Sequence, residues 1–139
     1  MDFIWISGIL FILNMSVVFL SIENLNLFTF FLFVIICPAI LFAICTNYII
    51  RNVKSDTLQI TIASALFVFI ILAFSYFRIS DSALVAIAKN TAVLTQNIAG
   101  LTVTNLDLDF SISSFVMLFL LEFILIKLLR KVREKYVRK

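Results

Sequence analysis

Several residue types that support common catalytic chemistry are absent from this sequence or nearly so. It contains no histidine, two cysteines, two glycines and one proline in 139 residues. The absence of histidine excludes a Cys/His zinc site, a haem with a histidine ligand and a histidine-based catalytic triad. Two glycines cannot form a glycine-rich phosphate loop. Because no pair of catalytic groups recurs on one face, we expect no enzymatic activity, cofactor or metal site.

The sequence is rich in apolar side chains. It contains more of them than a single soluble core of this length could bury. The hydrophobic share is 63%, the mean hydropathy is +1.18, and only 14% of residues are charged. A helix needs about 20 apolar residues to cross the hydrocarbon of a bilayer. The runs between charges therefore predict an all-α membrane protein, a single domain with four transmembrane helices at about 3–22, 25–50, 57–77 and 110–129.

The distribution of cations predicts how the chain is threaded. Placing both termini in the cytoplasm puts Arg51, Lys54 and the basic tail at 130–139 on the inner side. The first run lacks a basic leader and a cleavage site, so we expect it to stay as a helix, paired with the second in an antiparallel hairpin. The alternative is a fifth, re-entrant span between the third and last runs, but a full crossing would place most of the basic tail outside. We therefore expect a multi-pass protein of the bacterial inner membrane.

The segment 80–109 is the one sizeable stretch predicted to lie outside the membrane. A helix is expected first, with Asp81 or Ser82 as its N-cap and Gly100 as its stop. Beyond Gly100 the pattern changes to a two-residue period, which predicts a short strand or an extended lead into the last span. The expected apolar stripe of the helix consists of Leu84, Ile87, Thr91, Leu94 and Ile98.

Two polar side chains lie inside predicted spans and are candidates for function. Glu122 is costly in lipid, so it either binds a proton or cation in a cavity or pairs with Lys127 or Arg130 at the cytoplasmic interface. Asn14, with Ser16 close by, is expected to form an interhelical hydrogen bond rather than a transport site.

The second span contains the only proline and both cysteines. Pro38 predicts a kink, and Ala39 with Ala43 forms a small-residue face suited to helix contact. Cys37 and Cys45 lie about 12 Å apart along one helix axis, too far to form a disulfide.

The basic tail continues the helical pattern of the last span. Leu128, Val132 and Tyr136 recur every four residues and form one apolar seam. Two interpretations remain open, anchoring to anionic lipid and docking of a cytosolic partner with an acidic face. The residues expected to take part are Arg130, Lys131, Arg133, Lys135 and Tyr136.

In its layout the chain resembles the membrane subunit of the Kiwa anti-phage defence system, a small bacterial four-span protein with a soluble DNA-binding partner. The likeness covers span count, orientation, the outer segment 80–109 and the basic tail 130–139. It implies a homo-oligomeric inner-membrane sensor that anchors its soluble partner and does not itself bind nucleic acid.

Self-association, with a tetramer as the first expectation, is also predicted from side chains that a lone four-helix bundle would struggle to bury. These are Asn14, Ser16, Ala39, Ala43 and Glu122. The alternative function is a small channel, holin-like pore or transporter that uses Glu122 and Asn14 within an oligomeric pore. A closed bundle axis filled with phenylalanine would indicate a scaffold, and Glu122 lining water would indicate a pore.

Overall fold

A computed structural model describes residues 2–50, 56–95, 106–108 and 110–137, and the described residues contain helices and no strand. Four helical stretches are long and apolar enough to cross a membrane, which confirms the all-α class and the four predicted spans. In chain order the elements are α1 (Asp2–Ser21), η1 (Ile22–Asn24), α2 (Leu27–Phe30), η2 (Phe31–Ile36), α3 (Cys37–Ile49), α4 (Asp56–Arg78), α5 (Asp81–Thr95) and α6 (Ile112–Val137).

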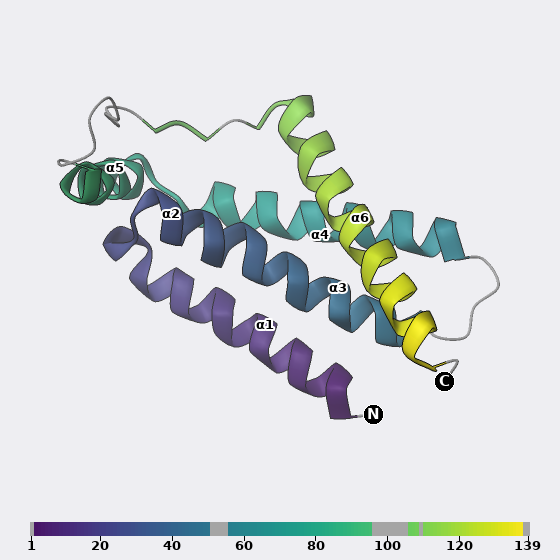
Figure 1. The fold of residues 1–139 in the computed structure, drawn as a ribbon. Helices are drawn as coiled ribbons and strands as arrows, with labels where there is room; N and C mark the ends of the chain where they lie inside the picture. The colour runs from purple at the N-terminus through teal and green to yellow at the C-terminus, as the bar shows by residue number, and fades with distance from the viewer. Residues whose placement is uncertain (1, 51–55, 96–105, 109, 138–139) are drawn as a thin grey trace.

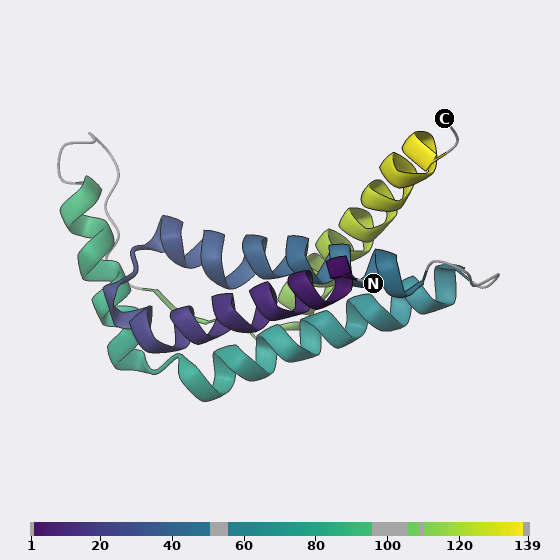
Figure 2. The ribbon, with the colours of Figure 1, turned by 90° about the horizontal axis from the view of Figure 1, so that it is seen from below.

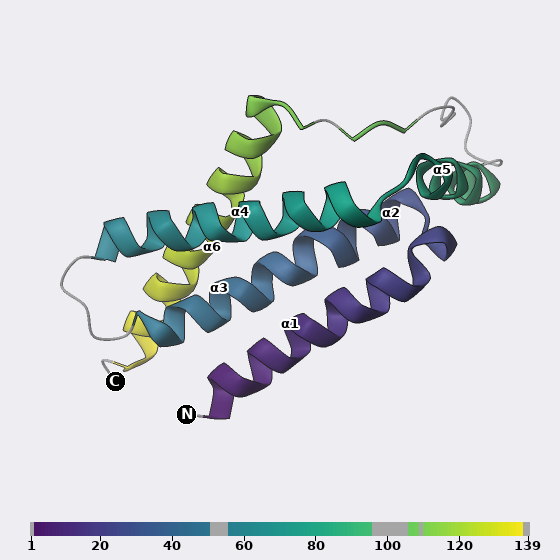
Figure 3. The ribbon, with the colours of Figure 1, turned by 180° about the vertical axis from the view of Figure 1, so that it is seen from behind.

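The helix α3 is the centre of the bundle, since it packs against α1, α4 and α6. The short turn at η1 makes α1 and the α2–α3 stretch antiparallel neighbours, as the sequence predicts. Helix α6 crosses α3 and α4 obliquely (Figures 1 and 3). The two chain ends lie at one end of the bundle, and α5 lies across the other end (Figures 1 and 2). Four long helices that alternate in direction produce this arrangement (Figure 1).

Three apolar clusters form the core along the bundle. The cluster nearest α5 joins Val18, Val34 and Ile87, and the middle one packs Phe67 against Ala39. The cluster nearest the chain ends is formed by Ala43, Ile50, Ile60 and Ile126. Rings of Phe11, Phe42 and Phe67 follow one another across the middle, with centroids 6.1 and 5.4 Å apart. The middle of the bundle thus contains a run of three phenylalanine rings, of which Phe67 is fully buried.

The helix α5 begins one residue earlier than the sequence predicts. Ser80, rather than Asp81 or Ser82, is the cap, because its hydroxyl accepts the Ala83 N–H at 3.3 Å and its carbonyl accepts the Leu84 N–H at 3.1 Å. Ser111 takes the same position before α6, where its hydroxyl accepts the Ser114 N–H at 3.4 Å. The last span therefore begins at Ile112 rather than Phe110. A serine immediately before a helix satisfies amide groups that have no partner inside it.

The buried face of α5 also differs from the predicted stripe. Leu94 is exposed, and Thr95 is buried in its place. Thr95 tolerates burial because its hydroxyl donates to the Thr91 carbonyl of the preceding turn at 3.0 Å. Ile98 and Gly100 lie outside the described residues. Residues 106–108 have no regular secondary structure, so the strand is not found among them.

Candidate functional site

Glu122 is the most unusual residue of the bundle. Its side chain is 0% exposed, and neither carboxylate oxygen has a hydrogen-bond partner among the described residues. Helix α6 carries it between Leu118, which packs on the middle cluster, and Ile126, which belongs to the cluster near the chain ends. The site is therefore a carboxylate enclosed by apolar packing.

The predicted pairing of Glu122 with Lys127 or Arg130 is wrong. Lys127 turns its ammonium over the Phe123 ring, 4.6 Å from the centroid, and Arg130 bonds Glu134 with 3.1 Å between Nε and Oε1. Residues five apart on a helix point about 140° away from one another, so Lys127 leaves α6 on another side. Glu122 therefore has neither of the ion-pair partners that its sequence position suggests.

The enclosure of Glu122 bears on the pore alternative. A pore through the single chain requires this carboxylate to line water, and both its oxygens are shielded from solvent. A buried carboxylate without a partner destabilises a fold. Its presence therefore needs a reason outside the packing of this one chain.

Asn14 forms the predicted interhelical hydrogen bond, and the backbone of the second span explains why the bond is needed. Its Nδ2 donates to the Phe33 carbonyl at 2.8 Å. Around Phe33 the backbone is π-helical, and the Cys37 N–H bonds the Leu32 carbonyl five residues back. The next bond in this series would join Pro38 to Phe33, but proline has no N–H. Asn14 supplies the missing donor, and the predicted kink at Pro38 takes the form of this π-helical segment.

Other residues predicted as assembly contacts act inside the chain or alone. Ala39 and Ala43 are completely buried against α4 and α6 clusters, so their small face is used within the bundle. Ser16 is exposed, and its hydroxyl donates to the Ile12 carbonyl of its own helix at 2.8 Å. Cys37 and Cys45 are free. The premise that one chain cannot bury these groups is thus wrong for Ala39, Ala43 and Glu122.

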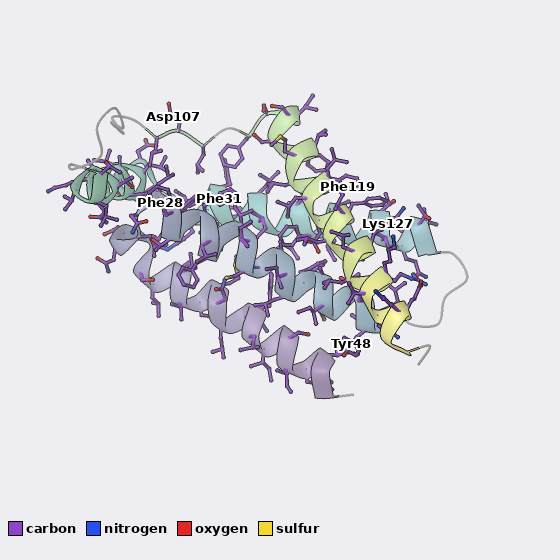
Figure 4. The ribbon with its side chains drawn as sticks, in the orientation of Figure 1. Phe28, Phe31, Tyr48, Asp107, Phe119 and Lys127 are labelled. Atoms are coloured by element: carbon purple, nitrogen blue, oxygen red, sulfur yellow. The ribbon has the colours of Figure 1, made fainter. Side chains whose placement is uncertain are left out.

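The end of α3 and the start of the basic tail are joined by a set of contacts that sequence reasoning missed. Asn47 donates from Nδ2 to the carbonyls of Ala43 and Ile126, at 3.1 and 3.0 Å. Arg133 donates from Nη1 to the Asn47 carbonyl at 2.6 Å, and its guanidinium lies 5.6 Å from the Tyr48 ring centroid. Arg133 therefore holds α6 against the end of α3, beside Tyr48 (Figure 4).

The opposite side of the same stretch of α6 is unoccupied by the chain itself. Leu128 and Val132 are each about half exposed, and Lys131 and Lys135 are exposed. We call these four residues the tail face. The side chain of Tyr136 lies outside the described residues. The tail face is thus an apolar pair bordered by cations on a helix that is held in place.

A second missed set of contacts holds α5 on the outer turn. Thr91 accepts the Leu27 N–H at the start of α2 at 2.8 Å. Asn90 donates from Nδ2 to the carbonyls of Glu23 and Leu25, at 2.9 and 3.0 Å. Two adjacent side chains of α5 therefore bond backbone groups of the connection between α1 and α2. This fixes the end of the bundle opposite the tail.

Comparison with protein-family models, with curated proteins and with solved structures finds no match for this chain.

Proposed function

We propose that the chain is a small subunit of the bacterial inner membrane that holds a cytosolic partner protein on its tail face. Both termini lie in the cytoplasm in this proposal, and 80–109 lies outside. One observation carries it: α6 is a single helix from the span to Val137, fastened by Arg133 and exposing the tail face.

The chemistry of the tail face indicates the kind of partner that fits. An exposed apolar pair along one helix is the pattern by which an amphipathic helix docks into a groove or onto another helix. Cations beside it favour an acidic partner through electrostatic complementarity. Because Arg133 already positions α6, less conformational freedom is lost on binding than with a mobile tail.

The resemblance to the Kiwa membrane subunit supports a more specific proposal. The partner is then the soluble component of an anti-phage complex, and any contact with nucleic acid is made by that component. The outer segment, held on its turn by Asn90 and Thr91, is the part placed to meet a signal from outside. Glu122 remains available to tune the assembly.

Docking is tested by two changes to the tail face. We expect deletion of 135–139 and Val132→Ser each to reduce recovery of cytosolic partners with the tagged chain by at least about fivefold, since truncating an important interface residue costs more than about 1 kcal/mol. Quantitative mass spectrometry of co-purified proteins measures this. Val85→Ser is the matched control, because Val85 is also an exposed helical valine but lies on α5. If both tail variants retain every partner while Glu122→Gln abolishes ion flux in reconstituted vesicles, the pore alternative replaces this proposal.

The same experiment needs a check of orientation. With Cys37 and Cys45 replaced, cysteine placed at Lys89 should react with an impermeant thiol reagent from outside, and cysteine at Lys135 should not. Both positions are exposed. Labelling of Lys135→Cys from outside would overturn the cytoplasmic position of the tail.

Self-association is the remaining part of the proposal. Since Ala39, Ala43 and Glu122 are buried within one chain, a second copy must use an exposed apolar surface, and the exposed side of α1 is one such surface. That side includes Gly8, where an added Cβ would meet nothing within 4 Å. We expect the protein component in a nanodisc to have a mass that is a multiple of 15.9 kDa, four copies first. A mass of 15.9 kDa alone would contradict this.

A further inference from the structure

A pocket of about 360 Å³ opens between the start of α4 and the last turns of α6. It lies at the end of the bundle where both chain ends are found, and Figure 4 labels Lys127 in this part of α6. Its volume falls in the range of small-molecule sites. The residues that line it, which we call the basic pocket, are Thr57, Ile60, Lys127, Arg130, Lys131 and Glu134.

The charge of the basic pocket is mostly positive. Three cations and one carboxylate line it, and that carboxylate, Glu134, is already bonded to Arg130. Neither Lys127 nor Lys131 forms an ion pair within the described part of the chain, and Lys127 contacts only the Phe123 ring by its ammonium. Two ammonium groups on successive turns of one helix therefore face this space without an acidic partner among the described residues.

The α4 side of the basic pocket adds a polar rim and an apolar floor. Thr57 belongs to the first turn of α4, at the helix end that carries a positive partial charge. Ile60, one turn further along, is 2% exposed and closes the bottom. On the same side of α6 as Lys127, three and seven residues further into the span, Ile124 and Leu120 are about half exposed. An anionic group held here would lie directly above apolar side chains that belong in hydrocarbon.

We propose that the basic pocket binds the phosphate-bearing headgroup of an anionic phospholipid, with its acyl chains along α6. Cationic pockets between membrane helices on the cytoplasmic side are suited to such headgroups. The assignment of this pocket to the cytoplasmic leaflet rests on the proposed function. The preference of the pocket for an anionic group rests on its own residues and is independent of that function.

The test uses the purified full-length chain without any cytosolic partner, so its failure is distinct from failure of the docking proposal. Native mass spectrometry in a mild detergent would compare phosphatidylglycerol with phosphatidylcholine. We expect at least about tenfold tighter binding of phosphatidylglycerol. Each of Lys127→Gln and Lys131→Gln should weaken it by about fivefold, in keeping with the value of one basic residue near an anionic surface.

A variant that makes the basic pocket more positive provides a second test with the opposite expected effect. Glu134→Gln removes the carboxylate that pairs with Arg130, so it should strengthen phosphatidylglycerol binding by about fivefold. Glu23→Gln changes the net charge equally at the other end of the bundle and should leave binding unchanged. Lys135→Gln, in the tail face but outside the basic pocket, should also leave it unchanged.

Three results would overturn the proposal. The first is equal binding of the two lipids by the unaltered chain. The second is an effect of Glu23→Gln or Lys135→Gln as large as that of the pocket variants, which would show a response to net charge alone. The third is full competition by millimolar inorganic phosphate, which would make free phosphate the ligand. Circular dichroism of each variant checks that the helices are retained, and Lys127→Arg, if folded, should keep the lipid preference.

Discussion

Replacing Glu122 with methionine is expected to stabilise the folded chain by about 1–3 kcal/mol, the usual cost of leaving a buried polar group without a partner. Both carboxylate oxygens are enclosed and unbonded in the described structure, so the substitution removes no hydrogen bond there. Methionine has a similar length, and its flexible thioether fills irregular space. Thermal unfolding followed by circular dichroism in one detergent measures the change.

Leu125→Met is the matched control for this prediction. Leu125 lies on the same helix and packs against the neighbouring clusters, and a volume-conserving apolar exchange costs less than about 1.5 kcal/mol. If Glu122→Met destabilises the chain by more than Leu125→Met, Glu122 has a partner in the membrane that the single chain does not supply. If it stabilises the chain and impairs assembly or partner recovery, the carboxylate is retained for function at a cost in stability.

Replacing Thr91 with valine is expected to destabilise the chain by about 1–2 kcal/mol. Valine has the same shape but cannot accept the Leu27 N–H, which begins α2 and then has no acceptor in the described contacts. The loss falls on the turn between the first two spans. We therefore also expect faster proteolysis there at sites between Glu23 and Leu27.

Thr95→Val is the control, because Thr95 is buried on the same face one turn later. Its hydroxyl bonds only carbonyls of its own helix, Thr91 at 3.0 Å and Ala92 at 3.4 Å. Removing such a bond leaves no backbone donor unpaired, so the change in unfolding free energy should be less than about 0.5 kcal/mol. Equal losses for the two variants would mean that the contact with Leu27 does not stabilise the turn.

The sequence predicts those parts of the fold that depend on local pattern or on the thickness of a bilayer. The four spans follow from lengths between charges, and the helical continuation beyond Arg130 follows from the spacing of Leu128 and Val132. The bond that Asn14 forms is predictable in kind, because an amide in hydrocarbon needs a partner. The acceptor of that bond is not predictable, because no residue pattern in this apolar run distinguishes a π-helical turn from an ordinary α-helical one.

The remaining features depend on which distant segments meet. In the sequence Arg133 is indistinguishable from the other cations of the tail. Only the fold brings the end of α3 next to it, where the Asn47 carbonyl accepts its hydrogen bond. Asn90 and Thr91 read as ordinary polar positions of a surface helix. The sequence offers Glu122 the nearest cations along the chain as partners, but the direction of each side chain around the helix decides which of them can meet.

The π-helical turn has a consequence for how this protein can change over time. Asn14 donates to the Phe33 carbonyl, which has no backbone donor because residue 38 is proline. A change of Asn14 alone leaves that carbonyl without a donor in lipid, whereas a change of Pro38 alone restores a backbone donor and makes Asn14 superfluous. The harm done by a substitution in α1 thus depends on the residue present in α3. Loss of Asn14 is therefore tolerated only after Pro38 has been replaced. The order in which substitutions occur at these two positions is constrained.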